Sequence, residues 1–275
     1  MDIFKDKVCI ITGAASGIGR GLSEALARQG ARIVAADIDG EGAERVASGI
    51  GERAEARRLD VADADAVEAL VREVAAAHGR LDYMFNNAGF AVHGDTLDSS
   101  LEQWRRIVDV NLMGVVHGSL AAYRVMADQG HGHIVNTASL AGLIGSVLFS
   151  SYAMTKAGVV MLSRMLRFEG ADRGVRVTAV CPGFIKTGIY GNATYNRVDQ
   201  VDAFAQIPFP LVELEPAIEK ILRGVARNKE LIVFPAYARI LWWLTRFAPG
   251  LTAPVHRKTI RDLRKIRKAA PPEPL

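Results

Sequence analysis

The sequence predicts an α/β fold, a doubly wound parallel sheet of about seven strands with helices on both faces and a C-terminal helical extension. Three observations predict it. Short apolar runs alternate with longer segments of helical periodicity, which implies parallel strands joined by right-handed crossovers. Runs that are apolar on both faces are typical of strands covered by helices on both sides. Candidate ligand-binding residues follow the ends of these runs, where such sheets bind ligands.

The strands and helices are expected to alternate along most of the chain. Strands are expected at Val8–Thr12, Arg32–Ala36, Glu55–Leu59, Tyr83–Asn86, His133–Ala138, Arg176–Cys181 and Leu231–Phe234. Helices are expected at Gly17–Gln29, Glu41–Ser48, Ala64–His78, Leu101–Ala127, Ser150–Asp172 and Pro216–Asn228.

Charge is distributed unevenly along the 275-residue chain. The composition, 49% hydrophobic and 23% charged, is ordinary for a globular protein with a sizeable core. The net charge of +4 arises from the segment 256–268, which holds seven basic residues against the single acid Asp262. The rest of the chain is slightly acidic. A basic nucleic-acid-binding body is therefore excluded, and no nucleic acid partner is expected.

The cysteines and histidines indicate neither a disulfide framework nor a metal site. Cys9 and Cys181 each lie in an expected buried strand and are interpreted as small core residues. The six histidines have no metal-ligand company, so no metal is expected. No signal peptide is indicated before the first strand, and no run reaches the roughly 18 to 20 apolar residues that cross a bilayer. Cytoplasmic localisation is expected.

A glycine-rich turn joins the first expected strand to the first helix. Glycines there allow a sharp turn and close approach of the backbone to a pyrophosphate, while the helix N-terminus offers free N–H groups. A tight turn alone would also explain them, but the strand–turn–helix context favours a dinucleotide site. The candidate cofactor-binding residues are Gly13, Ser16, Gly17, Ile18 and Gly19.

Asp37 ends the second expected strand, 18 residues after Gly19. A carboxylate at this position accepts hydrogen bonds from both adenosine ribose hydroxyls and repels a 2′-phosphate. None of Ala15, Ser16 and Ile38 is basic, so the sequence favours NAD over NADP. The alternative is that Asp37 merely caps the following helix.

Further strand ends carry small or amide residues that suit a ligand lying across the sheet edge. Asp60 and Val61 end the third strand, and the fourth ends in Asn86-Asn87-Ala88-Gly89. The candidate cofactor-binding residues in these turns are Asp60, Val61, Asn87, Ala88 and Gly89.

Tyr152 and Lys156 are four residues apart on an expected helix, so they share a face. A nearby ammonium lowers the pKa of a phenol from about 10 and suits it to acid–base work near neutral pH. Ser139, at the end of the fifth strand, could hold a substrate oxygen by a hydrogen bond. Asn111 is an unusual polar residue inside a long expected helix. The Tyr–Lys pair alone is weak evidence of catalysis. The occurrence of all these motifs in order along the chain indicates a catalytic site.

Together the motifs resemble the short-chain dehydrogenase/reductase family in its single-domain, NAD-preferring form. The resemblance covers about residues 5 to 235 and implies one Rossmann-type dinucleotide-binding and catalytic domain at 1–235, with 236–275 as a C-terminal extension. The matching motifs are Thr12-Gly13-x-x-x-Gly17-x-Gly19, Asp60, Asn86-Asn87-Ala88-Gly89, Asn111, Ser139, Tyr152-x-x-x-Lys156 and Pro182-Gly183.

The resemblance implies a role for each catalytic residue. Tyr152 would be the general acid/base, and Lys156 would lower its pKa and bind the nicotinamide ribose; Tyr152 and Lys156 thus also count as cofactor-binding. Ser139 would fix the carbonyl or alcohol, and Asn111 would anchor a water that connects Lys156 to solvent.

The resemblance also implies further cofactor contacts and an assembly. Pro182 and Gly183 would face the nicotinamide, with Ile185 and Thr187 as further cofactor contacts. Similar proteins are dimers or tetramers that pair through the helices beginning near Leu101 and Ser150, so a homodimer or homotetramer is expected.

The expected substrate-binding residues are apolar or aromatic, apart from Ser139. A lid is expected at about 187–210. No arginine there is an obvious clamp for a carboxylate, which favours a hydrophobic alcohol or ketone such as a steroid, a terpenoid or a long-chain compound; alternatively the lid packs on itself. The candidate substrate-binding residues are Ser139, Val147, Phe149, Phe184 and Tyr190.

The C-terminal extension begins with an expected helix, Tyr237–Ala248, that is apolar nearly all round and should therefore be buried. Tryptophans followed by a basic segment are what peripheral contact with an anionic membrane needs. The alternatives are that the helix covers the substrate cleft or an oligomer interface and that the tail is a solvated charged face. The last residues, 269–275, are Pro-rich and expected to be disordered.

Three functions remain open on the sequence. The first is an NAD-dependent oxidoreductase acting on CH–OH groups, with oxidation as the expected direction. The second is a non-catalytic dinucleotide-binding regulator, which has no reason to keep Asn111, Ser139, Tyr152 and Lys156 together. The third is an NADP-linked 3-oxoacyl reductase, against which Asp37 argues.

Overall fold

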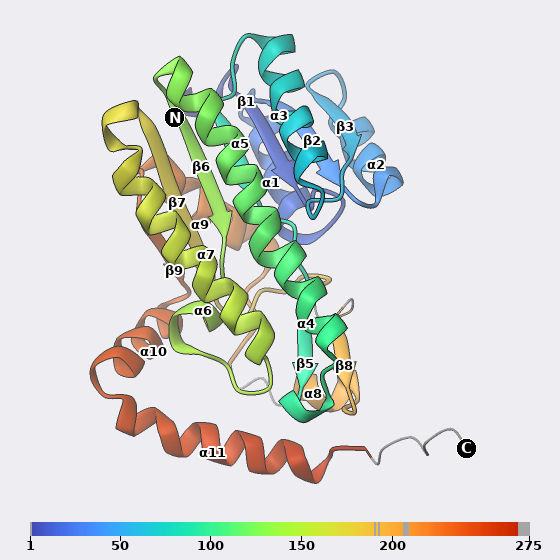
Figure 1. Cartoon of the computed structure of the whole chain (residues 1–275), viewed down its shortest axis with the longest axis vertical. Helices are drawn as coiled ribbons and strands as arrows, with labels where there is room; N and C mark the ends of the chain where they lie inside the picture. The colour runs from blue at the N-terminus through green and yellow to red at the C-terminus, as the bar shows by residue number, and fades with distance from the viewer. Residues whose placement is uncertain (1, 190, 192, 206–208, 269–275) are drawn as a thin grey trace.

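Seven parallel strands form one sheet, in the order β3-β2-β1-β4-β6-β7-β9. The computed structural model describes residues 2–189, 191, 193–205 and 209–268 (Figure 1). The predicted fold class is confirmed, and every strand end lies within one residue of its expected position. The strands are β1 (Val8–Thr12), β2 (Arg32–Asp37), β3 (Ala54–Arg58), β4 (Tyr83–Asn86), β6 (Gly132–Thr137), β7 (Val175–Pro182) and β9 (Leu231–Phe234).

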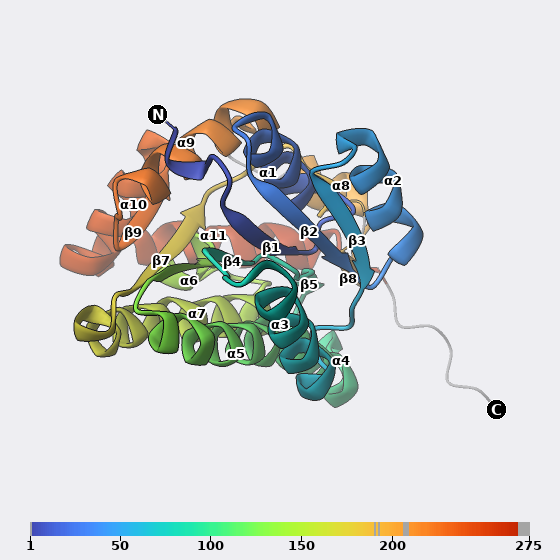
Figure 2. The same ribbon diagram turned by 90° about the horizontal axis from the view of Figure 1, so that it is seen from above.

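Helices cover both faces of the sheet, α1, α2 and α9 on one and α3, α5 and α7 on the other (Figure 2). Successive strand side chains enter opposite cores, so Cys9 and Ile11 pack toward α1 and α9 while Val8 and Ile10 pack toward α3 and α5. This double burial explains the continuous apolar runs. The helices are α1 (Gly17–Arg28), α2 (Gly40–Ile50), α3 (Ala64–His78), α5 (Gly114–Gln129), α7 (Ser150–Glu169) and α9 (Leu214–Ala226).

The edge strand β3 departs from the expected burial on both faces. Its side chains are half-buried or exposed, and Glu55 and Arg57 form an ion pair across 3.1 Å. The reason is that β3 lies at the edge of the sheet. Among the described residues, it pairs with a strand, β2, on one side only.

The helix expected at Leu101–Ala127 is interrupted. It consists of α4 (Leu101–Val108), a π-helical turn at Asp109–Met113 and α5. The side chain of Asn111, in this turn, is fully buried. Such turns place an extra residue inside a helix and often occur at functional sites.

The region expected to be a lid contains regular structure. A short strand, β8 (Thr194–Asn196), pairs in parallel with β5 (Val92–Gly94), and helix α8 (Gln200–Ala205) follows. The described lid residues Val198 and Ala203 pack in one cluster with Leu148 and Leu263.

Two helices, α10 (Ala236–Phe247) and α11 (Pro249–Lys265), form the C-terminal extension. The expectation that the first is buried is wrong: Ala238 is its one buried residue, while Ile240, Trp243 and Phe247 are exposed. The apolar side chains of α10 lie on all sides of the helix, but β9 and the short helix α6 (Ala141–Ile144) cover only one side of it. In the described part of the chain, no helix is long and apolar enough to cross a membrane.

The basic tail is not simply a solvated charged face. Arg267 and Arg197 both contact Asp98, whose side chain is 4% exposed, and Arg264 bonds Asp95 at 2.9 Å. Ion pairs therefore hold the end of α11 against the segment between β5 and α4. The expected disordered end, 269–275, lies outside the described residues.

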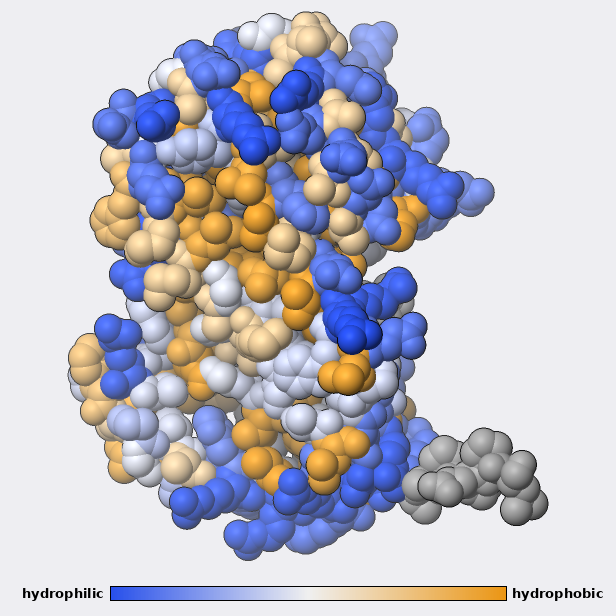
Figure 3. Space-filling model, in the orientation of Figure 1, coloured by the Kyte–Doolittle hydropathy of each residue, from blue (hydrophilic) through white to orange (hydrophobic). Residues whose placement is uncertain are grey.

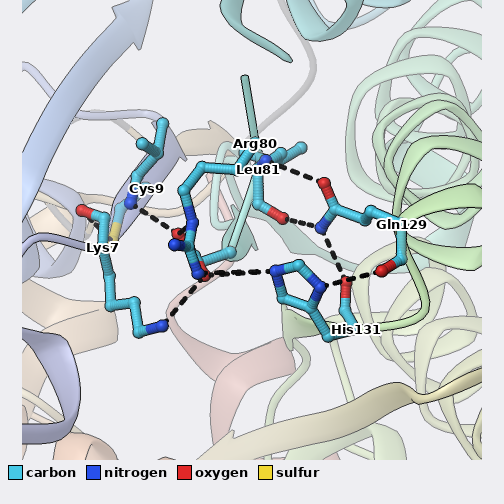
Figure 4. Close-up of polar contacts among 8 residues, drawn as sticks. Lys7, Cys9, Arg80, Leu81, Gln129 and His131 are labelled. Atoms are coloured by element: carbon cyan, nitrogen blue, oxygen red, sulfur yellow. Dashed lines mark hydrogen bonds and ion pairs between the residues drawn. The ribbon is translucent and has the colours of Figure 1, made fainter. Parts of the chain in front are cut away.

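A buried carboxylate, Asp82, connects residues at the opposite end of the strands. Figure 4 labels Lys7, Arg80, Leu81 and Gln129 of the network around it. It accepts hydrogen bonds from the backbone N–H of Val8 at 3.0 Å and from Arg80 Nε at 2.7 Å, with Lys7 Nζ at 3.3 Å. The side chain of Gln129, at the end of α5, makes two hydrogen bonds with the backbone of Leu81. Its Oε1 accepts the Leu81 N–H, and its Nε2 donates to the Leu81 carbonyl. This network lies at the amino ends of β1 and β4, away from the predicted site.

Candidate active site

The glycine turn after β1 fits tightly against the turn after β4. Gly13 and Gly17 have φ of +67° and +52°, a region that favours glycine. A Cβ on Gly19 would lie 2.0 Å from the Gly13 carbonyl oxygen, and one on Gly13 would lie 2.8 Å from the Cα of Ala88. A Cβ on Gly17 would contact Thr187 at 3.5 Å. The structure thus brings these predicted cofactor residues together from three separate loops.

Thr12 and Asn87 join the carboxyl ends of three strands. The Thr12 hydroxyl accepts the backbone N–H groups of Asn87 and Ala88 at 2.9 and 3.1 Å, and Asn87 Nδ2 donates to the Thr12 carbonyl. Thr137 Oγ1 donates to Asn87 Oδ1 at 3.2 Å. These bonds fix the edge of β1, β4 and β6 on which a dinucleotide would lie.

Asp37 faces the glycine turn rather than the helix that follows it. Its carboxylate accepts the backbone N–H of Ala15 at 2.9 Å and that of Asp39 at 3.0 Å. Asp39 is the residue that caps α2, through Gly42 N–H, so the capping alternative for Asp37 is wrong. The structure also sets Arg58 beside Asp37 in the register of β2 and β3, a cation that local sequence did not reveal.

The remaining predicted cofactor residues of the first three strands lie at the same edge. Ser16 is the exposed residue before α1, and Ile18 packs partly on the core. Asp60 Oδ1 accepts the Ala62 N–H at 2.9 Å. Val61 is buried, with its carbonyl oxygen 3.0 Å from a ring nitrogen of His117.

Lys156 is buried on α7, one turn from Tyr152. Its Nζ lies 5.7 Å from the centre of the Tyr152 ring and donates to the Thr137 carbonyl at 2.8 Å. Burial lowers the pKa of Lys156 to about 8, with the neighbouring Cys181 acting in the opposite direction. The side chain is thus held by the end of β6.

Ser139, just after β6, lies beside Tyr152. Burial raises the pKa of Tyr152, and the neighbouring Ser139 hydroxyl lowers it. That Lys156 lowers the pKa of Tyr152 stays a prediction. Ser139 Oγ accepts the Ala141 N–H at 3.1 Å, which fixes its orientation.

Asn111 and Lys156 meet beside Gly89. Asn111 bonds the backbone of Phe90 in both directions, its Nδ2 donating to the carbonyl at 2.8 Å and its Oδ1 accepting the N–H at 3.0 Å. A Cβ on Gly89 would lie 3.0 Å from Asn111 Oδ1 and 3.4 Å from Lys156 Nζ. The four predicted catalytic residues therefore gather in one place.

Aromatic side chains lie next to Tyr152 on the predicted substrate side. The Phe149 ring is 6.2 Å from that of Tyr152 and 4.6 Å from that of His93. Val147 packs beside Leu148 against α11. Phe184 stacks on Phe209 with ring centres 6.4 Å apart. The predicted substrate residue Tyr190 lies outside the described residues.

The loop after β7 carries the other predicted cofactor contacts. Pro182 ends β7, and its carbonyl accepts the Leu140 N–H at 2.9 Å, which connects it to the loop of Ser139. Ile185 is buried in the core and bridges to Val212, on the far side of the lid.

Sequence reasoning missed Tyr237, at the start of α10. Its hydroxyl accepts the backbone N–H of Phe184 at 2.9 Å, and its ring stacks on Phe209 at 4.3 Å and 8°. A Cβ on Gly183 would lie 2.6 Å from this hydroxyl, so glycine is required there. No periodic pattern signals such a contact, since it joins residues after two different strands.

His93 was also missed, although it is buried beside Phe149. Burial lowers the pKa of His93 to about 4, so the ring is neutral at neutral pH. Its Nδ1 has no hydrogen-bond partner within the described chain. Over the same residues, no group of three or more His, Cys, Asp or Glu side chains could hold a metal ion.

Comparisons with known proteins agree with this geometry. SadH of Mycobacterium tuberculosis (strain ATCC 25618 / H37Rv) is 37% identical over 254 residues, which cover 90% of this chain and 92% of that protein. Cyclohexanol dehydrogenase of Acinetobacter sp. (strain SE19) is 40% identical over 67% of this chain and 75% of its own length. A short-chain dehydrogenase/reductase of Burkholderia phymatum, solved in complex with NAD, has a TM-score of 0.77 at 28% identity and covers 99% of both chains. The family model for short chain dehydrogenases matches residues 7–197, and the chain belongs to that family of oxidoreductases.

Proposed function

We propose that the protein is an NAD-dependent oxidoreductase that interconverts a hydrophobic secondary alcohol and its ketone. The observation that carries the proposal is the position of Ser139 beside Tyr152, one helical turn from the buried Lys156. Two hydroxyl groups then bind one substrate oxygen, and an ionisable phenol is placed to exchange its proton.

The proton chemistry follows from these groups. In the oxidising direction, Tyr152 Oη accepts the proton of the substrate hydroxyl while Ser139 Oγ holds the same oxygen. A nicotinamide held by Gly183, Ile185 and Thr187 would supply the acceptor for the hydride of the substrate carbon. In the reducing direction, Tyr152 donates its proton to the ketone oxygen. Lys156 and Asn111, which meet beside Gly89, are the proposed route by which this proton exchanges with solvent through a water.

The residues around the turns fit a dinucleotide. The glycine turn leaves no room for a Cβ where a pyrophosphate would approach, and α1 begins there with free N–H groups. Asp37 would accept hydrogen bonds from the adenosine ribose hydroxyls. Gly183, Ile185 and Thr187 would line the nicotinamide end. The Asp37 carboxylate favours NAD, and the adjacent Arg58 makes NADP the alternative to be tested.

Apolar walls favour a hydrophobic substrate. Phe149 lies beside Tyr152, Phe209 stacks on Phe184 and Tyr237, and Val147 packs with Leu148. The cyclohexanol dehydrogenase relative acts on an alcohol by its name, which supports a CH–OH substrate.

The test is a panel of secondary alcohols and hydroxysteroids with NAD⁺, followed by NADH absorbance. We expect turnover that rises with substrate hydrophobicity and is lost in Tyr152→Phe. Turnover confined to 3-oxoacyl substrates with NADPH would support the reductase alternative. Tight dinucleotide binding without turnover of any substrate would support the regulator alternative.

We further propose that copies pair through α5 and α7. Apolar side chains are exposed along α7, and the space-filling view shows an apolar surface over α5 and α7 (Figure 3). Light scattering should show a dimer or tetramer that dissociates in Met161→Lys/Phe168→Lys; unchanged mass would contradict the pairing. The exposed residues are Leu120, Met154, Met161, Met165 and Phe168.

A further inference from the structure

An apolar stripe is exposed along the last two helices. Ile240, Trp243 and Phe247 of α10 are 60%, 60% and 64% exposed, and Leu251 and Val255 of α11 are 68% and 62% exposed. Spacings of three and four residues place the members of each helix on one face of it. Large apolar side chains that are this exposed mark a surface that binds a protein, a membrane or a ligand.

Cations accompany this stripe without acids. Between Glu230 and Asp262 the sequence has no Asp or Glu. The five cations in that interval are exposed, and none forms an ion pair with any described residue. The cations that follow, Arg264, Arg267 and Lys268, are by contrast paired with acids. The five unpaired cations are Arg239, Arg246, Arg257, Lys258 and Arg261.

Helices α10 and α11 form an outer edge of the molecule. They lie beyond the carboxyl ends of the strands, at the lower end of Figure 1. The ion pairs of Asp95 and Asp98 and the packing of Leu263 on Leu148 fix α11 there. On the face shown in Figure 3, hydrophilic side chains lie along the lower margin of the molecule.

A second copy of the chain would bring the same five unpaired cations against one another, which opposes self-association through this edge. An anionic lipid surface complements both features, since its interface accepts apolar side chains and its headgroups attract cations. We propose that α10 and α11 dock the protein onto an anionic bilayer surface. Trp243 and its apolar neighbours enter the interface, and Arg257, Lys258 and Arg261 contact headgroup phosphates. The proposal does not depend on the proposed reaction.

Docking would set the substrate side of the site close to the bilayer. Leu148 and Val147, which precede Phe149 and Tyr152, pack directly on Leu263 of α11. A hydrophobic substrate dissolved in the membrane could then reach the site without crossing much water.

The test is flotation of the full-length protein with vesicles of phosphatidylcholine, with and without phosphatidylserine. We expect binding to the phosphatidylserine vesicles that falls with added salt. Ile240→Ser/Trp243→Ser/Phe247→Ser should weaken binding by about tenfold or more. The control is Leu97→Ser/Leu101→Ser/Val201→Ser, which removes three apolar groups elsewhere that are even more exposed. It should bind like the wild type.

Charge is tested separately, in case the apolar variant does not fold. Arg257→Gln/Lys258→Gln/Arg261→Gln should weaken binding by about tenfold or more. Arg28→Gln/Arg105→Gln/Arg106→Gln has the same net charge and should not.

Tryptophan fluorescence gives an independent readout of insertion. It should shift to the blue on phosphatidylserine vesicles, and Trp243→Phe should reduce the shift. Three results would overturn the proposal: wild-type protein that stays unbound, equal binding by each variant and its control, or a charge or apolar variant that changes oligomer mass but not vesicle binding.

Discussion

The hydroxyl of Tyr237 accepts the backbone N–H of Phe184 at 2.9 Å, which joins the C-terminal extension to the loop after β7. The contact spans 53 residues and leaves no room for a side chain on Gly183. The loop after β7, which we propose faces the nicotinamide, is therefore fixed by Tyr237, a residue outside the segment 7–197 that the family model matches.

Tyr237→Phe should loosen this loop without emptying the space. The phenylalanine ring keeps the stack on Phe209, but the Phe184 N–H loses its acceptor, at a cost of about 1 kcal/mol in the free energy of unfolding. We expect a higher KM with kcat little changed. Tyr123→Phe is the control, because no hydrogen bond of the Tyr123 hydroxyl is found within the described residues. Equal unfolding curves and KM values for the two variants would contradict the role.

Tyr152→Phe should lower kcat by about 10² to 10⁴, the usual contribution of a positioned acid or base. The ring stays in place, so the Kd for dinucleotide, measured by calorimetry, should change little. Ser139→Ala should fall between this variant and the wild type, since Tyr152 still contacts the substrate oxygen. A Tyr152→Phe enzyme of near-normal kcat would assign proton transfer to another group.

Alcohol oxidation should become faster as pH rises. Burial raises the pKa of Tyr152, so the phenolate that accepts the hydroxyl proton forms above neutral pH. Ser139 lowers that pKa, and Ser139→Ala should therefore shift the rising limb of kcat to higher pH. A profile of kcat against pH for both proteins checks this. A limb that does not move would show that Ser139 does not set the pKa of Tyr152.

Asp37→Ala should raise the NADP⁺-to-NAD⁺ ratio of kcat/KM by about tenfold, the equivalent of about 1.4 kcal/mol. The carboxylate that repels a 2′-phosphate is removed, while Arg58 remains beside the site to attract it. Asp39→Ala removes a carboxylate two residues away that caps α2, and should reduce stability without changing the ratio. Wild-type enzyme that prefers NADP⁺ would remove the argument from Asp37.

Asp82→Asn should destabilise the fold by about 2 kcal/mol near neutral pH without affecting the site. Burial opposes ionisation of Asp82, but the bonds from Arg80 and Val8 and the charge of Lys7 outweigh it and lower its pKa (Figure 4). A lowered folded pKa means that this stability is fully present above the unfolded value of about 3.9 and is lost as pH falls through the folded value. Urea unfolding at neutral and acidic pH should show the difference between wild type and variant shrinking below pH of about 4. A constant difference would contradict the assignment.

The sequence by itself determined the sheet, the order of strands and helices along the chain, and the turns at strand ends. These depend on short-range physics: burial on both faces produces apolar runs such as Val8–Thr12, and the tight approach at Gly13 and Gly19 excludes any side chain. The same turns placed Asn87 and Ser139 at one edge, because parallel strands end together. The chemical roles of these residues remain proposals.

The tertiary structure decided what depends on distant contacts. Asn111 is explained by a π-helical turn that brings its amide to the backbone of Phe90. Arg267 binds Asp98, 169 residues earlier, and anchors a tail for which the sequence left a solvated charged face open. The exposure of Trp243 likewise depends on which elements cover α10. Periodicity reports whether a helix is apolar, but whether that surface is covered depends on the strand order and on the partners that the completed fold provides.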